Sequence, residues 1–380
     1  MQNEPGIIMK NFLLTVVLFF VVTACLDAQN LWGKYDYLFQ PEQHCVVYQT
    51  NEKIIIDGVP DESAWDHAAW SADFMDIEGG NKPVPEFRTR IKMLWNDSSL
   101  FIFAELEEPH IWAYLKEHDQ IIYHENDFEI FLDPNNNAHD YFEFELNAAN
   151  TLFDLFLTKP YRDGGIPLIT WNAPGFTSAV SISGTLNNPA DTDQKWTAEI
   201  AIPFESLKTG IKSQVPVDGQ IWKVNFSRVQ WKTDISEGKY KKKKDKNTGL
   251  FLSENNWVWN PTGEINLHVP ERWGMLQFSK SDVKNPNDTF EMPQYEELKK
   301  QLWLVYYKQQ DFMLAFDNYA TSLALLSMPE SVSDASGNTA KLEMLATELQ
   351  FTALLKTADG KVFAINEEGF LSEKIKTVQP

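Results

Sequence analysis

Two short stretches in which apolar and polar residues alternate limit the fold more than any other feature of the sequence. In Asp127–Asp133, the residues Phe128, Ile130 and Leu132 fall on one face, and Tyr141–Asn147 repeats the pattern. Successive side chains of a β-strand point to opposite faces of a sheet, so a period of two predicts strands. We expect the two strands to pair and to present one apolar face and one face of carboxylate, amide and aromatic groups.

Further strands and turns follow one another at roughly regular spacing on both sides of this pair. Arg88–Trp95 and Leu100–Glu105, for example, flank a turn signal at Asn96-Asp97. Many short alternating strands separated by turn residues are typical of all-β sandwiches. We therefore predict a mainly β fold, an antiparallel β-sandwich over residues 51–280, preceded by a lead-in over residues 29–50.

The character of the sequence changes near its C-terminus, over residues 290–380. Apolar residues recur at helical spacing from Tyr295, which predicts one long amphipathic helix or two, ending near Ser327. A further helix is predicted over Thr339–Ala346, and a β-hairpin around Asp359-Gly360. These elements form a small α/β appendage to the sandwich.

An export signal is predicted over residues 1–28. A lysine precedes the apolar run Phe12–Val22, which is shorter than the roughly 20 residues that a membrane-spanning helix needs. The run ends in a segment that resembles a bacterial lipobox, in which Cys25 would be lipidated; plain cleavage near Ala28 is the alternative. Both imply an exported protein that is extracellular, periplasmic or an outer-membrane lipoprotein, with a lipid anchor as its only membrane contact.

Charge and cysteine content narrow the classes of partner and site. The net charge of −21 argues against nucleic acid and anionic membrane surfaces, since both need clustered lysine and arginine. Only two cysteines are present, Cys25 and Cys45. At most one disulfide can form, and a four-cysteine zinc site is excluded.

Several motifs follow one another between about Ile54 and Phe278. They are Ile56-Asp57-Gly58, Lys92–Asp97, Asn126–Asp133, Tyr141–Asn147, Trp196–Pro203, Trp257–Pro261 and Arg272–Gly274. Their order and spacing resemble those of the family 9 carbohydrate-binding modules. The resemblance implies an antiparallel β-sandwich that clamps a sugar between two aromatic rings, with polar side chains holding the hydroxyl groups. It does not extend to the C-terminal appendage.

The same resemblance implies a set of ligand-binding residues. One clamp ring maps to a tryptophan late in the domain, with a carboxylate and an amide beside it. Tyr123 and His124 occupy the place of the second ring, and Glu145 stands where a typical member carries arginine. Aromatic rings suit the apolar face of a pyranose, and carboxylate and amide groups suit its hydroxyl rim. The predicted ligand-binding residues are Trp259, Glu129, Asn147, Glu145, Tyr123 and His124.

The loop between the two alternating strands is rich in side-chain oxygen atoms. Asp133, Asn135, Asn137 and Asp140 are candidate calcium ligands, because Ca²⁺ prefers carboxylate and amide oxygens. The loop lacks the turn glycine and the closing glutamate of an EF-hand, so a polar hairpin loop is the alternative. Members of the resembling family often hold structural calcium, and no other cofactor is required.

We conclude from the sequence that the protein is exported, binds oligosaccharide or polysaccharide without catalysis, and contributes to polysaccharide capture and catabolism. A glycoside hydrolase is one alternative, since glycosidases use two carboxylates and Glu129, Glu143 and Glu145 share one predicted sheet face. The other is a surface scaffold or assembly protein whose C-terminal helices dock a protein partner. No catalytic residue is assigned, because the sequence shows no Ser/His/Asp set, phosphate loop or Cys/His zinc cluster.

Overall fold

The computed structural model describes residues 33–208 and 215–374 of the chain. The chain divides at Pro41 into two compact units. The first contains the short helix η1 (Asp36–Phe39), and everything below concerns the second. The predicted export signal and Cys25 lie outside the described residues. Of the residues described, no helix is both long and apolar enough to span a membrane.

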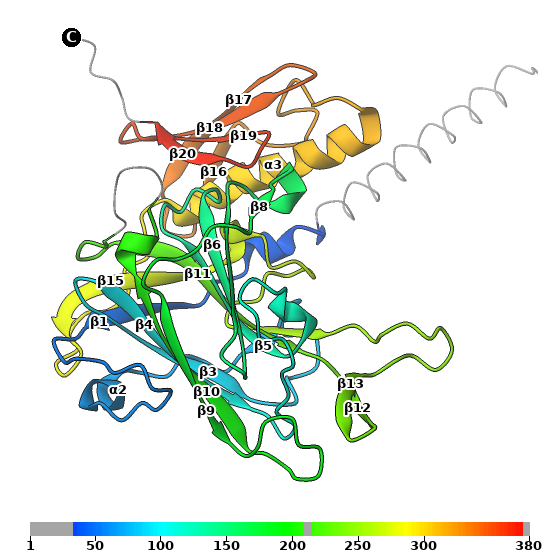
Figure 1. The fold of residues 1–380 in the computed structure, drawn as a ribbon. Helices are drawn as coiled ribbons and strands as arrows, with labels where there is room; N and C mark the ends of the chain where they lie inside the picture. Colours follow the sequence, from blue (N-terminus) through cyan, green and yellow to red (C-terminus); the bar gives the residue numbers. More distant parts are fainter. Residues whose placement is uncertain (1–32, 209–214, 375–380) are drawn as a thin grey trace, which may run out of the picture. The chain divides into compact units, whose positions relative to one another are not determined.

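One large sheet dominates the second unit (Figure 1). In the described residues it has 13 strands, most of them paired antiparallel, with the central order β8-β7-β6-β5-β11-β15-β1-β3-β4-β10-β9. The predicted mainly β fold is thereby confirmed. The strands are β1 (His44–Gln49), β2 (Met75–Asp76), β3 (Thr89–Trp95), β4 (Ser99–Glu107), β5 (Asp127–Asp133), β6 (Tyr141–Asn147), β7 (Leu152–Leu157), β8 (Pro167–Leu168), β9 (Thr177–Ser183), β10 (Lys195–Pro203), β11 (Ile221–Gln230), β14 (Asn255–Val258) and β15 (Gly274–Asp282).

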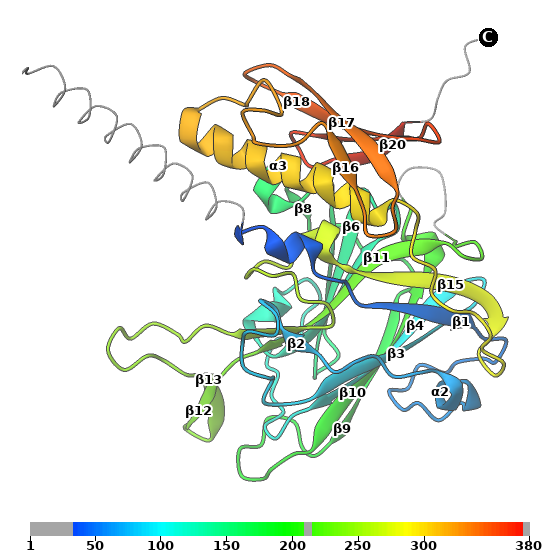
Figure 2. The same cartoon turned by 180° about the vertical axis from the view of Figure 1, so that it is seen from behind.

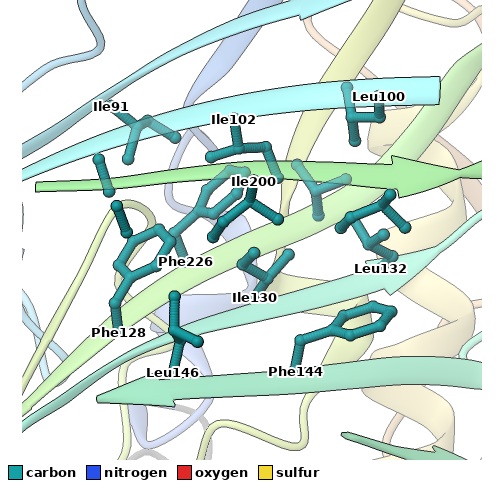
Figure 3. Close-up of a cluster of buried hydrophobic side chains, with 14 of the residues drawn as sticks. Ile91, Leu100, Ile102, Phe128, Ile130, Leu132, Phe144, Leu146, Ile200 and Phe226 are labelled. Carbon is teal, nitrogen blue, oxygen red and sulfur yellow. The ribbon is translucent and has the colours of Figure 1, made fainter. Parts of the chain in front are cut away.

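The core lies between the two halves of this sheet, as in a sandwich (Figure 3). Ile91 and Ile102 from β3 and β4 face Ile130 and Phe144 from β5 and β6, and all four are almost completely buried. Burying one such side chain contributes about 1.5–3 kcal/mol. The apolar faces predicted for the two alternating stretches therefore do form the core.

Strand β1 joins the two halves and differs from the sequence-based expectation. It runs parallel to both of its neighbours, with His44 paired to Met275 of β15 and Gln49 paired to Trp95 of β3. The predicted lead-in, residues 29–50, is therefore wrong at its C-terminal end, and the sandwich is not purely antiparallel. Only one residue of β1, Val47, is fully buried, so the strand carries too little alternation to be detected.

The C-terminal appendage is one helix lying along a five-stranded antiparallel sheet (Figure 2). The predicted helix over Thr339–Ala346 is wrong, because this segment is β17. Ala340 and Leu342 alternate inward there, and pairing with β16 and β18 overrides its helical propensity. The elements are α3 (Glu296–Phe316), β16 (Ser331–Ser333), β17 (Thr339–Ala346), β18 (Phe351–Thr357), β19 (Val362–Asn366) and β20 (Leu371–Lys374).

The remaining elements are short. Helix α3 ends at Phe316 rather than near Ser327, because Asp317 adopts a left-handed conformation with φ of 59°. The others are α2 (Ser63–His67), η2 (Ile122–His124), η3 (Tyr161–Asp163), η4 (Phe204–Ser206), η5 (Pro270–Arg272) and the hairpin of β12 (Thr233–Ser236) and β13 (Lys239–Lys242).

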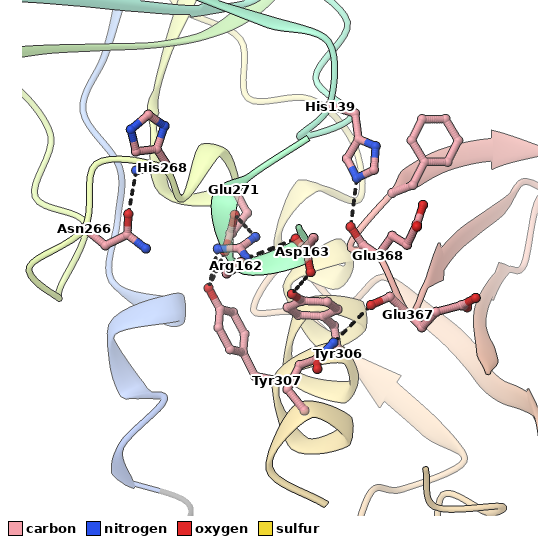
Figure 4. A network of polar contacts seen from close by, with 12 residues as sticks. His139, Arg162, Asp163, Asn266, His268, Glu271, Tyr306, Tyr307, Glu367 and Glu368 are labelled. Carbon is pink, nitrogen blue, oxygen red and sulfur yellow. Dashed lines mark hydrogen bonds and ion pairs between the residues drawn. The ribbon is translucent and has the colours of Figure 1, made fainter. Parts of the chain in front are cut away.

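Buried polar contacts join the appendage to the sandwich (Figure 4). Arg162 of η3 donates two hydrogen bonds of 2.9 Å to the carboxylate of Glu271, and Tyr307 of α3 donates a third to the same group. Tyr306 of α3 donates to Asp163 at 2.5 Å. Because Arg–carboxylate pairs of this kind are geometrically specific, they fix how α3 packs against η3 and η5.

Candidate functional site

A cleft of about 440 Å³ opens on the polar face of β5, β6 and β7. Its floor is formed by three glutamates, Glu129, Glu143 and Glu145. Two tyrosines stand at its rim, Tyr123 from η2 and Tyr161 from η3. The other lining residues are Ile77, Ile121, Phe153, Leu155, Pro167, Ile169, Val229, Glu254, Asn256, Ile265, Asn266, Leu267 and His268.

Strand register brings the three glutamates together. In the antiparallel pair β5–β6, Glu129 lies directly opposite Glu145, and Glu143 is two residues further along the same face. Directly opposite residues have Cβ atoms about 4.5–5.5 Å apart, so these like charges destabilise the pair unless something compensates them. The sequence places this face outward, towards solvent. Instead the loops around η2, η3 and β14 cover it, and the three residues are only 2–5% exposed.

Burial controls the ionisation of this floor. It raises the pKa of Glu129 to about 7. Burial, together with the charges of the neighbouring glutamates, also raises the pKa values of Glu143 and Glu145 well above their ordinary range. The floor is therefore a set of closely spaced carboxyl groups. A ligand would stabilise them if it offsets their negative charge or accepts hydrogen bonds from their protonated forms.

The rim supplies aromatic surface and hydroxyl groups. Tyr123 is 41% exposed and Tyr161 43%, which leaves ring surface available to a ligand. The backbone N–H of Tyr123 donates to Glu145 at 2.8 Å and so fixes η2 against the floor. Burial and the nearby glutamates raise the pKa of both tyrosines, so both hydroxyl groups stay protonated at neutral pH.

His268 closes one side of the cleft as a neutral side chain. Burial, helped by Arg162, lowers its pKa to about 3. Its Nδ1 lies 2.9 Å from the hydroxyl group of Tyr141, and its Nε2 lies 3.9 Å from Glu143. The ring of Tyr161 meets the imidazole edge-on, with 4.5 Å between the ring centroids.

The position of Trp259 corrects the sequence-based site. Its ring is 2% exposed and packs in the core between the sheet halves, edge-on to Phe226 at 5.8 Å. Gly274 has no side chain at this point, and a Cβ atom there would lie 2.4 Å from the indole. Trp259 is therefore not available for stacking on a sugar, because strand pairing turns it inward.

Asn147 is also withdrawn from the predicted site. It is fully buried at the end of β6, where its side-chain oxygen accepts hydrogen bonds of 3.0 Å from the backbone N–H groups of Ala149 and Thr151. Its amide nitrogen donates to the carbonyl oxygen of Leu115 at 2.9 Å. These bonds shape the turn after β6, as asparagine commonly does, and leave no group for a ligand.

The remaining predicted residues divide into two groups. Glu129, Glu145 and Tyr123 line the cleft together, whereas His124 is exposed beside Tyr123 without lining it. Sequence reasoning missed Tyr161, and it also missed Asn256, Asn266 and His268, because these residues reach the cleft from η3, from the short strand β14 and from the loop after it, none of which shows alternation. The only available signal was their density of polar and aromatic groups.

Several side-chain oxygen atoms of the predicted calcium loop accept hydrogen bonds from backbone N–H groups of the same loop. Both carboxylate oxygens of Asp133 accept backbone hydrogen bonds, from Asn135 at 3.0 Å and Ala138 at 2.8 Å, and Asn137 accepts one from His139 at 2.8 Å. The backbone N–H of Asp140 donates to Thr158. These contacts explain the composition of the loop without a metal, so calcium binding there stays a prediction.

Two other groups of side chains have a spacing suited to a metal ion. One is the set Asp127, Glu129 and Glu145, and the other is the set His118, Asp119 and Asp154. In each set, one atom from every member lies within 4.8 Å of the others. The first set is buried and shares two residues with the cleft floor.

Comparison with known protein families gives a match to the part of the chain that contains the floor of the cleft. Residues 56–225 match the family model for the carbohydrate family 9 binding domain-like proteins. The matched part of the family 9-like domain contains Glu129, Glu143, Glu145, Tyr123 and Tyr161, whereas Asn256, Asn266 and His268 lie beyond it. No curated protein matches the sequence.

Solved structures similar to this one include carbohydrate-binding proteins. A presumed carbohydrate-binding protein from Bacteroides uniformis is 15% identical with a TM-score of 0.46, and the match covers 63% of this chain and 100% of that one. A family 9 carbohydrate-binding module from Caldicellulosiruptor kristjanssonii in complex with cellotriose is 15% identical with a TM-score of 0.39, covering 66% and 98%. A family 9 module from the same organism in complex with glucose is 15% identical with a TM-score of 0.38, covering 64% and 100%.

Proposed function

We propose that the protein binds oligosaccharide or polysaccharide in the cleft, without catalysis. The observation that carries this proposal is the cleft itself. Two exposed tyrosines stand over a floor of three carboxyl groups within a family 9-like domain. The volume of about 440 Å³ falls in the range of small-molecule sites and is sufficient for one or two sugar units.

The chemistry of the cleft matches the two sides of a pyranose ring. Tyr123 and Tyr161 offer aromatic surface to its apolar C–H face, while the floor glutamates and the amides of Asn256 and Asn266 offer partners to its hydroxyl groups. A hydrogen bond to a neutral group contributes about 0.5–1.5 kcal/mol and one to a charged group about 1.5–3 kcal/mol. Two or three such bonds with one stacked ring account for micromolar to millimolar binding once the costs of association are included.

Replacement of the rim tyrosines tests the proposal. We expect Tyr123→Ala and Tyr161→Ala each to weaken binding at least tenfold, since either change removes stacking surface without touching the core. A glycan array would identify a ligand, and calorimetry with that oligosaccharide would measure the change. Phe251→Ala is the matched control, because Phe251 is 54% exposed and lies outside the cleft. Unchanged affinity in both tyrosine variants would contradict the proposal.

A glycoside hydrolase is the second candidate, because three carboxyl groups meet on the cleft floor. Retaining glycosidases hold two carboxyl groups about 5–5.5 Å apart, and one carboxyl oxygen of Glu129 lies within 4.8 Å of one of Glu145. Reducing-sugar release from a panel of plant and algal polysaccharides, abolished by Glu129→Gln, would establish this activity. Binding without any turnover would leave the non-catalytic function.

The proposal extends to export and to polysaccharide capture at the cell surface. The apolar run before Cys25 supports it, with lipidation or plain cleavage as alternatives. Mass spectrometry of the mature N-terminus, compared between the wild type and Cys25→Ser, distinguishes the two. A protein partner for the C-terminal appendage is also proposed. Leu314 and Phe316, at the exposed end of α3, are 87% and 61% exposed and offer the apolar contact.

A further inference from the structure

Three carboxyl groups meet beneath the cleft at a spacing that suits one metal ion. Asp127 and Glu129 come from β5 and Glu145 comes from β6, and one oxygen from each lies within 4.8 Å of the other two. We propose that these residues bind a hard divalent cation, calcium, at the floor of the cleft. The site is separate from the loop around Asp133.

The electrostatics of the group call for a positive partner. Asp127, Glu129 and Glu145 are 0%, 3% and 2% exposed, so their charges are almost completely removed from water. Among the described residues, no lysine or arginine forms an ion pair with any of the three. Buried carboxylates are costly unless they are paired, coordinate a metal or take up protons, and a doubly charged cation would supply the partner that the protein itself does not.

Unused oxygen atoms point to where the ion would bind. Oδ2 of Asp127 and Oε2 of Glu129 are buried and have no hydrogen-bond partner. Oδ1 of Asp127, in contrast, accepts from the backbone N–H of Val229 at 3.2 Å, and Oε2 of Glu145 accepts from that of Tyr123 at 2.8 Å. These backbone bonds orient the carboxyl groups while the unpartnered oxygens stay free for a ligand. In native proteins, unpartnered buried polar atoms are rare and need an explanation.

The spacing and donor type favour calcium. Ca²⁺ binds oxygen atoms at about 2.3–2.6 Å, so two ligands of one ion lie at most about 5 Å apart, which the limit of 4.8 Å satisfies. Three carboxylates supply three to six of the six to eight oxygens that Ca²⁺ takes, and water completes the shell. Glu129 and Glu145 also line the cleft, so water can reach the ion from that side.

Calcium titration of the full protein, without sugar, tests the site. After dialysis against a chelator, calorimetry with CaCl₂ and luminescence of Tb³⁺ should both show one saturable site per chain. Glu129→Gln should weaken calcium binding at least tenfold, and so should Glu145→Gln. His118→Ala is the control, since it alters the other candidate group. No calcium binding at about 10 mM, roughly tenfold above the weak end for extracellular calcium modules, would overturn the proposal, as would loss of binding only in His118→Ala.

Folding of the variants does not limit the test. Replacing a glutamate by glutamine removes charge repulsion, so we expect Glu129→Gln to fold and to melt at or above the temperature of the calcium-free wild type. Calcium should then raise the melting temperature of the wild type but not of the variant. Equal calcium shifts in both proteins would overturn the site even if both fold well.

The calcium site and the proposed sugar binding fail in distinguishable ways. Calcium binding is measured without sugar, and sugar binding is measured separately with calcium and with a chelator. Calcium binding without sugar binding would leave the metal site and remove the proposed function. If the protein binds sugar but not calcium, the proposed function stands and the metal site is overturned.

Discussion

Trp259 matches the motif position of a ligand-contacting tryptophan, yet in the structure it packs in the core. The indole fills the space left by Gly274 and lies in the core beside Phe226, so its contribution is to packing. Trp259 was predicted to bind a ligand from its position in a motif, and a motif position does not determine the direction of the side chain. Strand pairing decides that, because the residue after β14 is held by a hydrogen bond of 2.9 Å from its backbone N–H to Phe226.

A Trp259→Ala substitution separates packing from ligand binding at the scale of one residue. Removing a large buried aromatic side chain costs about 3–5 kcal/mol through lost burial and the cavity that remains. We therefore expect the free energy of unfolding to fall by that amount in urea titrations, while sugar affinity measured on the folded variant stays near that of the wild type. A large loss of affinity with unchanged stability would return Trp259 to the binding site.

At the scale of elements, alternation predicted the strands well and the appendage poorly. The period of two in β5 and β6 gave the faces of both strands, including the glutamates at the floor of the cleft. It could not show that loops cover this face, since η2, η3 and β14 lie outside the two strands and only the tertiary fold places them over it. In β17 the residues themselves favour a helix, and only pairing with β16 and β18 selects the strand.

Helix α3 begins with an ion pair that makes its docking depend on pH. Burial tends to raise the pKa of Glu296, but Lys223 of β11 and Lys299 outweigh it and lower that pKa to about 2. A carboxyl whose folded pKa is depressed stabilises the protein above its unfolded pKa, near 4.5, and this stability is lost as the pH falls towards 2. The contribution is roughly 1–3 kcal/mol.

Glu296→Gln should remove this contribution at neutral pH and flatten the stability curve between about pH 4.5 and 2, relative to the wild type. Urea titrations at several pH values would measure the effect. Glu373→Gln, on an exposed strand of the appendage, is the control. Parallel curves for the wild type and Glu296→Gln across this range would show that the ion pair does not link α3 to the sandwich.

At the scale of the whole molecule, the structure suggests that the sandwich and the appendage unfold together. Lys300 of α3 pairs with the buried Glu42 at 3.0 Å, and Glu42 also pairs with Arg272 at 2.7 Å. Tyr307 of α3 shares the carboxylate of Glu271 with Arg162. Charges of one part are therefore balanced by groups of the other, so the appendage is bound tightly to the sandwich.

Truncation before residue 290 tests this coupling. Breaking a buried ion pair by removing one partner costs roughly 3–5 kcal/mol, so we expect the shortened chain to melt roughly 5–15 °C lower than the full chain. Calorimetry of the full chain should show one transition. Two transitions, one of them unchanged in the truncated protein, would contradict this expectation. Because truncation weakens the sandwich, a loss of sugar binding in the shortened chain would not implicate the appendage unless its folded fraction is measured in parallel.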